Sequence, residues 1–394
     1  MRMRSGRMFV IVCVALLLGL LPLAVSADAS PQRLPAPAPG VIYQDFSEGF
    51  AAVQLGQKYG FIDRAGKFVI PAQFDDEIPF SFGLAPVKVG DKWGYIDTAG
   101  ARVIAPQFDE ARGFTDVGLA RVRVGDKWGY IDRTGTFAIP ARYDDAFGFT
   151  EFLPSTLPAN TPSALPVYAA VKLGDKWGYI DTTGRQVIAP RFDDARDFTA
   201  DGIAGVKVGD KYGFINKAGA FVIPAQYDDI GFDSSGGRAA VKVGNLWGYA
   251  DAKTGQIVIP PRFDDPGDFV NGLAPVSTGG LWGYINPDGS FAITPRFTDA
   301  GFFGPEGLAG VQVGGQYGRV GRLGAASDPK APGGTYGFID RTGNFIIPPQ
   351  FEDAFEFSGG LARVQLHGKV GFIDRSGAFV IPPTFVPDPN PPQQ

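Results

Sequence analysis

Pairs of adjacent carboxylates recur along the chain and are the residues best suited to chemistry. The seven pairs are Asp75-Asp76, Asp109-Glu110, Asp144-Asp145, Asp193-Asp194, Asp228-Asp229, Asp264-Asp265 and Glu352-Asp353. Two carboxylates can act together as general acid and base, or they can ligate calcium. A calcium site needs about six to eight oxygen ligands, and the sequence contains no Asp-x-Asp-x-Asp-Gly loop. Because the pair recurs at one position of a repeated pattern, turn and capping roles explain it better than metal binding or catalysis.

The tryptophans form a second set of candidates, since an aromatic face can stack on a sugar. All of them occupy one position of the pattern: Trp93, Trp128, Trp177, Trp247 and Trp282. Tyrosine takes that position in three further units, and Val370 takes it in the last. A recurring core residue explains the position as well as a sugar platform does, and a valine there favours packing. The tryptophans are therefore candidate ligand-binding residues for which a structural role is favoured.

Basic residues also fall at regular positions, before the aromatic residue and in the strand that precedes it. The two sets are Lys58, Lys92, Lys127, Lys176, Lys211 and Lys369, and Lys88, Arg123, Lys172, Lys207 and Lys242. They could line an anionic groove, but solvated strand faces that oppose edge-to-edge association explain them better. The chain has one His and one Cys, which excludes His-based metal sites and Ser-His-Asp or Cys-His-Asp triads. We predict no catalytic residue, no metal site and no cofactor.

One sequence unit of about 35 residues, present nine times, must position all these candidates. In the second unit, residues 85–89 alternate apolar with other residues, 93–97 follow a Gly-Asp hairpin signal, and 101–104 precede Pro106. These patterns predict three short antiparallel strands, with residues 108–116 as a link to the next unit. The fold class is therefore all-β. Three short strands bury too little alone, so neighbouring units must complete the core.

The pattern Lys-Trp-Gly-Tyr-Ile-Asp-x-x-Gly-x-x-Val-Ile-x-Pro-x-Phe-Asp-Asp resembles the WG-repeat family of bacterial proteins, and it extends over residues 46–385. The resemblance implies an all-β repeat array of a kind that is often exported, and it brings no family-wide catalytic residues. In two units the lysine before the aromatic residue is replaced by leucine, at Leu246 and Leu281. Insertions interrupt the pattern near 151–166 and 315–334.

We predict that the nine units, over residues 46–386, form an open, solenoid-like superhelix of β-meanders. A closed, propeller-like toroid is the alternative. Propellers have about four to eight blades and often close by sharing one blade between the chain ends. Here the first unit begins with its own first strand and the ninth ends with its own third, so no shared blade is visible. That arrangement favours the open array.

The chain ends differ in composition from the repeats. Three arginines precede an apolar run, which predicts a signal peptide over residues 1–27, with an uncleaved anchor helix as the alternative. Residues 28–45 and 387–394 are Pro-rich and predict a linker and a tail. Since Cys13 lies within the signal segment, the mature chain is expected to be cysteine-free.

These features predict a non-enzymatic exported protein of the periplasm or cell surface. A net charge of −5 makes nucleic acid and anionic membranes unsuitable partners, and no stable membrane span is expected after signal cleavage. We expect a binding or scaffold module whose partner is an envelope or extracellular protein, or a cell-wall glycan. The alternative is a glycan-directed hydrolase, or its accessory domain, that uses carboxylates of the insertions such as Glu151 or Asp328.

Overall fold

The computed structural model describes residues 41–42, 45–149, 167–199, 201–231, 237–315 and 334–387. The chain divides into two units, Met1–Pro37 and Ala38–Gln394, and every described residue belongs to the second. Several predicted features lie wholly or largely outside the described residues: the signal peptide, the 28–45 linker, the insertions at 151–166 and 315–334 with Glu151 and Asp328, and the 387–394 tail. None of the described residues forms a helix with the length and hydropathy of a membrane span.

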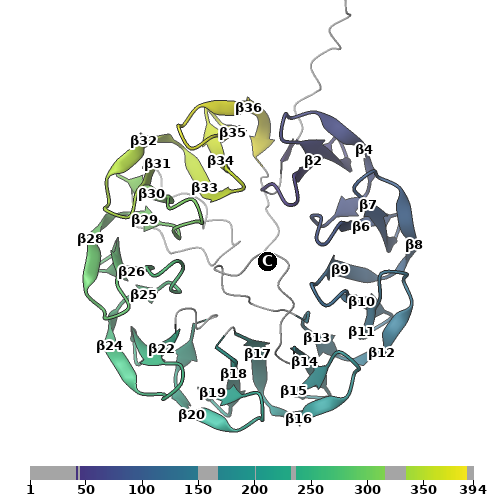
Figure 1. Ribbon diagram of the computed structural model, residues 1–394, viewed down its shortest axis with the longest axis horizontal. Coiled ribbons are helices and arrows are strands. Elements are labelled where there is room, and N and C mark those ends of the chain that lie inside the picture. The colour runs from purple at the N-terminus through teal and green to yellow at the C-terminus, as the bar shows by residue number, and fades with distance from the viewer. Residues whose placement is uncertain are drawn as a thin grey trace, which may run out of the picture. The chain divides into compact units, whose positions relative to one another are not determined.

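The described residues form nine four-stranded blades that follow one another around a ring (Figure 1). Blades 1–3 contain β1 (Val41–Ile42), β2 (Phe50–Leu55), β3 (Lys58–Asp63), β4 (Phe68–Phe74); β5 (Asp76–Glu77), β6 (Leu84–Val89), β7 (Lys92–Asp97), β8 (Arg102–Phe108); and β9 (Glu110–Phe114), β10 (Ala120–Val124), β11 (Lys127–Ile131), β12 (Phe137–Tyr143). Blades 4–6 contain β13 (Asp145–Ala146), β14 (Tyr168–Leu173), β15 (Lys176–Asp181), β16 (Gln186–Phe192); β17 (Asp194–Phe198), β18 (Ile203–Val208), β19 (Lys211–Asn216), β20 (Phe221–Tyr227); and β21 (Asp229–Ile230), β22 (Arg238–Val243), β23 (Leu246–Asp251), β24 (Ile257–Phe263). Blades 7–9 contain β25 (Asp265–Pro266), β26 (Ala274–Thr278), β27 (Leu281–Ile285), β28 (Phe291–Phe297); β29 (Asp299–Ala300), β30 (Ala309–Val313), β31 (Thr335–Ile339), β32 (Phe345–Phe351); and β33 (Asp353–Ser358), β34 (Leu361–Leu366), β35 (Lys369–Ile373), β36 (Phe379–Pro387).

The innermost strand of each blade was not predicted, because a three-stranded unit was expected from the sequence. It is formed by residues that were expected to link the units, such as Glu110–Phe114 in blade 3. In six blades this strand is only two residues long, which is too short to show a periodic pattern. The fourth strand is also longer than expected, since β8 continues past Pro106 to Phe108. Proline is tolerated there because β8 is the outer edge of its blade and pairs with β7 alone.

A close backbone approach explains why glycine follows the aromatic position in all nine units. The third and fourth strands shift register beside this glycine, for example between Trp93 and Tyr95. A Cβ atom on Gly94 would lie 2.5 Å from the carbonyl oxygen of Ile104, and the nine equivalent glycines have nearest distances of 2.4 to 2.7 Å. Any side chain at this position would therefore push the two strands apart.

Hydrophobic cores lie between neighbouring blades, with one cluster for each of the nine interfaces. Between blades 2 and 3, Trp93, Tyr95 and Phe108 pack against Ala111 and Phe114. Each blade therefore buries one face against the preceding blade and the other against the following blade. This confirms the all-β array of nine units.

The expectation of an open solenoid is wrong, because blade 9 packs on blade 1. Phe46 and Ile62 of blade 1 share a cluster with Val370, Phe372 and Phe385 of blade 9. The fold is therefore the closed propeller that the sequence analysis gave as its alternative.

Backbone and side-chain contacts at this seam show how the ring closes. The end of β36 pairs in parallel with β1, through Val386 with Val41 and Pro387 with Ile42. The Arg64 Nη1 atom of blade 1 donates to the Gly359 carbonyl of blade 9 at 2.6 Å, as Arg133 of blade 3 does to the Phe82 carbonyl of blade 2 at 2.7 Å. No blade is shared between the chain ends, as the sequence suggested. Closure needs only one more interface like the others and a two-residue strand pairing.

Candidate binding site on the inner rim

One row of residues crosses each blade from the centre of the ring to its outer edge. In blade 2 the row consists of Asp76, Lys88, Trp93 and Phe108, which are successive cross-strand partners. The row thus has an acid on the innermost strand, a base beside it, and two aromatic residues further out. Trp93 and Phe108 are buried, whereas Asp76 and Lys88 are partly exposed. The second acid of each pair, the basic position and the tryptophan position are therefore parts of one structural feature.

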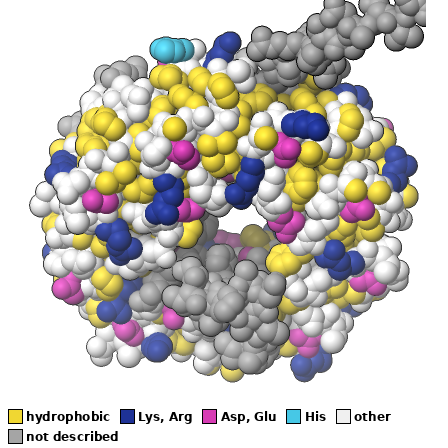
Figure 2. All heavy atoms as spheres, turned by 45° about the horizontal axis from the view of Figure 1, so that its top comes forward, with side chains coloured by type: hydrophobic (Ala, Val, Ile, Leu, Met, Phe, Trp, Pro, Cys, Tyr) yellow, Lys and Arg dark blue, Asp and Glu magenta, His cyan; other side chains and the backbone are white. Residues whose placement is uncertain are grey.

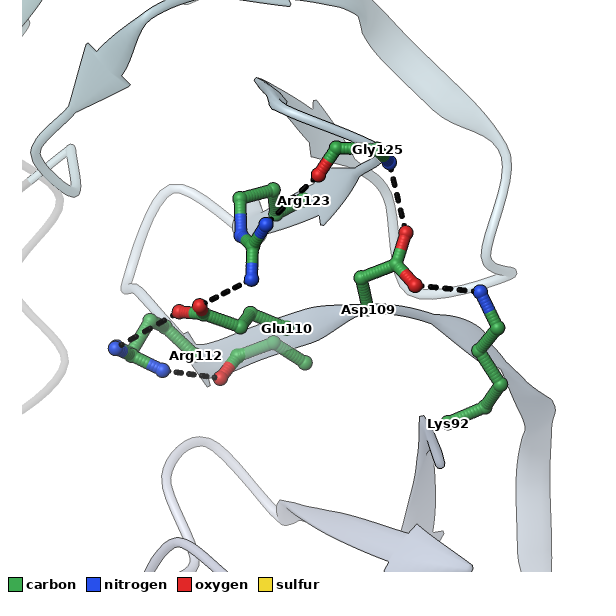
Figure 3. Close-up of polar contacts among 7 residues, drawn as sticks. Lys92, Asp109, Glu110, Arg112, Arg123 and Gly125 are labelled. Carbon is green, nitrogen blue, oxygen red and sulfur yellow. Dashed lines mark hydrogen bonds and ion pairs between the residues drawn. The ribbon is translucent and has the colours of Figure 1, made fainter. Parts of the chain in front are cut away.

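The first acid of five of the seven pairs joins two blades. Asp109 forms an ion pair with Lys92 of the preceding blade at 2.5 Å and accepts a hydrogen bond from the Gly125 N–H of its own blade at 2.7 Å (Figure 3). Four further aspartates make both contacts: Asp75, Asp144, Asp193 and Asp228. The lysine hydrogen bond, followed by the glycine N–H, lowers the pKa of all five carboxyls. These contacts support the structural role expected for the pairs.

The tryptophans lie in five different interfaces between blades and do not form a common surface. Trp93, Trp128, Trp177 and Trp282 are buried, with exposed fractions of 1% to 8%. Trp247 is partly buried against its cluster. The indole rings therefore pack between blades in this structure, and the charged ends of the rows remain accessible at the rim.

Charge on the inner rim does not follow the ninefold repeat. Blades 2–6 have a base beside the row acid, namely Lys88, Arg123, Lys172, Lys207 and Lys242. Blades 7–9 keep the acid but have Ser277, Gln312 and Gln365 instead of the base. In the space-filling view, acidic and basic side chains both lie beside the open centre (Figure 2).

Blade 3 adds two arginines to this rim, Arg112 on β9 and Arg121 on β10 (Figure 3 shows Arg112). Glu110 contacts Arg123 at 2.5 Å and Arg112 at 3.4 Å. The guanidinium carbons of Arg112 and Arg121 lie 5.7 and 5.1 Å from the centroid of the Trp128 ring. The Arg112 position is glycine in blades 6, 7 and 8, where Gly231, Gly267 and Gly301 replace it.

Arg121 is held between blades 3 and 4. Its guanidinium donates to the carbonyl oxygen of Ala146 on β13, and it lies 5.8 Å from the Phe147 ring centroid. Burial lowers the pKa of Arg121, and the nearby Arg112 charge lowers it further. Arginine remains protonated in proteins, so two positive charges stay close together at this interface.

Two further carboxyls lie near the centre in separate blades, Glu77 buried and Glu356 partly buried. Burial raises the pKa of Glu77 to about 8, with a smaller contribution from Asp76. Burial also raises the pKa of Glu356 to about 7, although Glu356 accepts a hydrogen bond from the Phe302 N–H at 3.3 Å. Among the residues that the structure describes, no three His, Cys, Asp or Glu side chains are placed to hold a metal ion.

The sequence analysis missed Arg112 and Arg121 as candidates. Arg112 lies in a segment that was expected to link two units, and Arg121 stands between the repeat alanine and valine of its strand. A comparison of the units position by position would have shown that blade 3 alone has arginine at both positions. The repeat pattern emphasises what the blades share, whereas the combination of these two arginines distinguishes blade 3.

Comparisons with solved structures support the fold alone, because every identity is low. The chain is similar to a eukaryotic initiation factor, with 12% identity and a TM-score of 0.51 over 79% of this chain and 89% of that one. It is also similar to dihydro-heme d1 dehydrogenase NirN, with 11% identity and a TM-score of 0.41 over 80% and 74% of the two chains. A third similar structure is PorZ, a surface component of the type-IX secretion system of Porphyromonas gingivalis, with 13% identity and a TM-score of 0.29 over 85% and 52%. Curated protein sequences give no significant match.

A family model described as WG containing repeat matches the chain in ten segments. They are residues 43–59, 59–93, 93–128, 128–151, 177–212, 212–247, 247–282, 282–317, 336–369 and 371–385. A full match such as 59–93 runs from one aromatic position to the next, so it covers the last two strands of one blade and the first two of the following blade. The matches cover most of the ring, and the chain therefore belongs to the WG-repeat family.

Proposed function

We propose that this protein is a non-catalytic binding module of the cell envelope that holds its partner at the inner rim of the ring. One observation carries the proposal: the recurring first acids and the lysines before the aromatic position join blade to blade, whereas the polar residues that differ among blades gather on the innermost two strands. Asp109 with Lys92 is an example of the first kind, and Arg112 is an example of the second. Because the charge of the rim varies around the ring, a partner with a complementary charge pattern would bind in one orientation.

Export and the choice of partner are part of the same proposal. The apolar run after three arginines supports passage through a membrane as a signal peptide. The partner would be a protein or a glycan outside the cytoplasm. Fold alone does not establish function, so the proposal rests on the rim residues rather than on similarity to other rings.

Sedimentation of the purified chain with isolated cell envelopes tests this function. We expect the chain to sediment with untreated envelopes and to stay in solution after its partner is destroyed. Pretreatment with protease would remove a protein partner, and pretreatment with muramidase would remove a cell-wall glycan. A chain that stays in solution with untreated envelopes would contradict the binding function. Turnover of glycan or peptide substrates that Glu151→Gln or Asp328→Asn abolishes would instead support the hydrolase alternative.

A further inference from the structure

We propose that blade 3 binds an acidic peptide segment through the guanidinium groups of Arg112, Arg121 and Arg123 at the inner rim. This inference rests on the proposed binding function and names the site and the chemical class of the partner. Below, these three residues are called the arginine cluster.

The charge balance of the arginine cluster favours an anionic ligand. Among the described residues, Glu110 is the one carboxylate within ion-pair distance of this cluster, and it contacts Arg112 and Arg123 but not Arg121. Asp145 and Asp197 act on Arg121 from further away, and each acts more weakly than the repulsion from Arg112. A carboxylate between the arginines would relieve that repulsion, and charge-assisted hydrogen bonds to guanidinium are strong. The positive excess stands out in a chain of net charge −5.

The arginine cluster is positioned by packing, and two of its three members are accessible. Packing of Arg112 and Arg121 on Trp128 limits their motion, so less side-chain entropy is lost when a ligand binds. The side chains of Arg112 and Arg123 are 42% and 30% exposed. A ligand can therefore reach them without displacing the core.

The other arginines of the rim already have carboxylate partners. In blade 5, Arg196 lies 3.7 Å from Asp229 and donates to the Gly231 carbonyl at 2.9 Å. In blade 9, Arg363 donates to Asp45 at 2.9 Å. Each joins its own blade to the next through that carboxylate. In blade 3, by contrast, Arg112 and Arg123 share Glu110, and Arg121 has no carboxylate within ion-pair distance among the described residues.

A peptide fits this site better than an acidic glycan does. The Trp128 ring is only 8% exposed, so it offers no open face for a sugar to stack on. In addition, β9 is an edge strand of five residues, Glu110–Phe114, that pairs with β10 alone. An edge strand can pair with an extended peptide while side chains of that peptide reach the arginines.

Fluorescence anisotropy with a labelled hexaglutamate peptide and the full chain tests the site. We expect saturable binding that weakens as salt is added. Arg112→Gln should weaken binding about tenfold, the effect of losing one charge-assisted hydrogen bond. Arg112→Lys should weaken it by less than Arg112→Gln, because lysine keeps the charge but not the planar fork. Arg185→Gln is the matched control, since Arg185 lies at a turn of blade 4 with its side chain 75% exposed; its affinity should equal that of the parent.

Several outcomes would overturn the inference. Absence of hexaglutamate binding would remove the site, and so would an affinity that Arg112→Gln leaves unchanged. Tighter binding of an oligogalacturonate than of hexaglutamate would favour an acidic glycan instead. Competition by inorganic phosphate at the same concentration as the peptide would indicate a general oxyanion site. If Arg112→Gln still sediments with envelopes as the parent does, the binding function stands and this site is not responsible for it.

Discussion

Blades 2–6 and blades 7–9 have the same strand order and the same row of cross-strand residues, yet they differ in charge at the rim. Lys242 stands beside Asp229 in blade 6, whereas Ser277 stands beside Asp265 in blade 7. The lysine that joins neighbouring blades also changes, to leucine at position 246. The difference shows that the buried part of the row maintains the fold, while its charged inner end is free to vary.

The loss of the base is compensated locally in blades 7 and 8. Ser277 accepts a hydrogen bond from the Asp265 N–H at 3.0 Å. In blade 8 the hydroxyl of Tyr336 donates to Asp299 at 2.6 Å, and burial raises the pKa of this aspartate. Polar contacts within the blade thus replace a charge pair exposed at the centre.

The largest expected effect comes from separating the two regions by dividing the chain at Pro260, in β24. Each fragment loses the seam between blades 9 and 1 as well as the cut blade, so its end blades expose their apolar faces. We expect neither fragment to unfold cooperatively in a denaturant titration followed by circular dichroism. Cooperative unfolding of the fragment 1–260 by itself would contradict a closed ring.

Removing a tryptophan from either region should have the next largest effect. Trp177→Ala in blade 4 and Trp282→Ala in blade 7 should each lower the free energy of unfolding by about 3–5 kcal/mol, because both side chains are buried. Thermal and denaturant unfolding of the two variants would measure this.

Trp177→Tyr is the matched control for the alanine variants. Tyrosine occurs at the same position in blades 5 and 8, where Tyr212 and Tyr336 donate to the row acid at 3.3 and 2.6 Å. Asp145 is the row acid of blade 4, so the tyrosine variant should fold with little loss of stability. An alanine variant as stable as the parent would show that the indole does not support the core.

A buried or partly buried carboxyl in each region gives a pH dependence of intermediate size. The pKa of Glu77 in blade 2 rises from 4.5 to about 8 on folding, and that of Glu356 in blade 9 rises from 4.5 to about 7. Between these values the folded chain keeps a proton that the unfolded chain loses, so stability falls as pH rises from about 4.5 toward each folded pKa. The loss should be larger for Glu77 than for Glu356, because the pKa of Glu77 rises further on folding. Glu77→Gln and Glu356→Gln should each make the stability depend less on pH. The effect of Glu77→Gln should extend to a higher pH, because the folded pKa of Glu77 is the higher of the two. Stability curves that neither variant changes would contradict this assignment.

The smallest effect should come from adding a lysine between blades 6 and 7, so that these blades are joined by the same kind of ion pair that joins successive blades from 1 to 6. Leu246→Lys places a lysine where Lys211 pairs with Asp228 in the preceding junction, and it should pair with Asp264. The Asp264 carboxylate already accepts from the Gly279 N–H at 2.6 Å. The gain should stay below about 1 kcal/mol, as for exposed ion pairs, and should fall with added salt. A gain that salt does not reduce would indicate a cause other than the ion pair.

The sequence by itself determined the number of units, the all-β class and the order of three strands in each blade. These features follow from local patterns, such as the alternation at residues 85–89 and the turn glycine at Gly100, which has φ +78°. The repeat glycine was also visible in the sequence, although its cause, a backbone approach to the fourth strand, is tertiary.

Only the tertiary structure decided the closure of the ring and the place of the arginine cluster. Closure depends on the rotation between blades accumulated over nine interfaces, and a pattern within one unit does not encode that sum. The pairing of β1 with β36 joins two residues from each end of the chain, and so short a segment has no detectable periodicity. Glu110, Arg112, Arg121 and Arg123 lie on two strands, one of them unpredicted, so their common site became visible only when β9 was paired with β10.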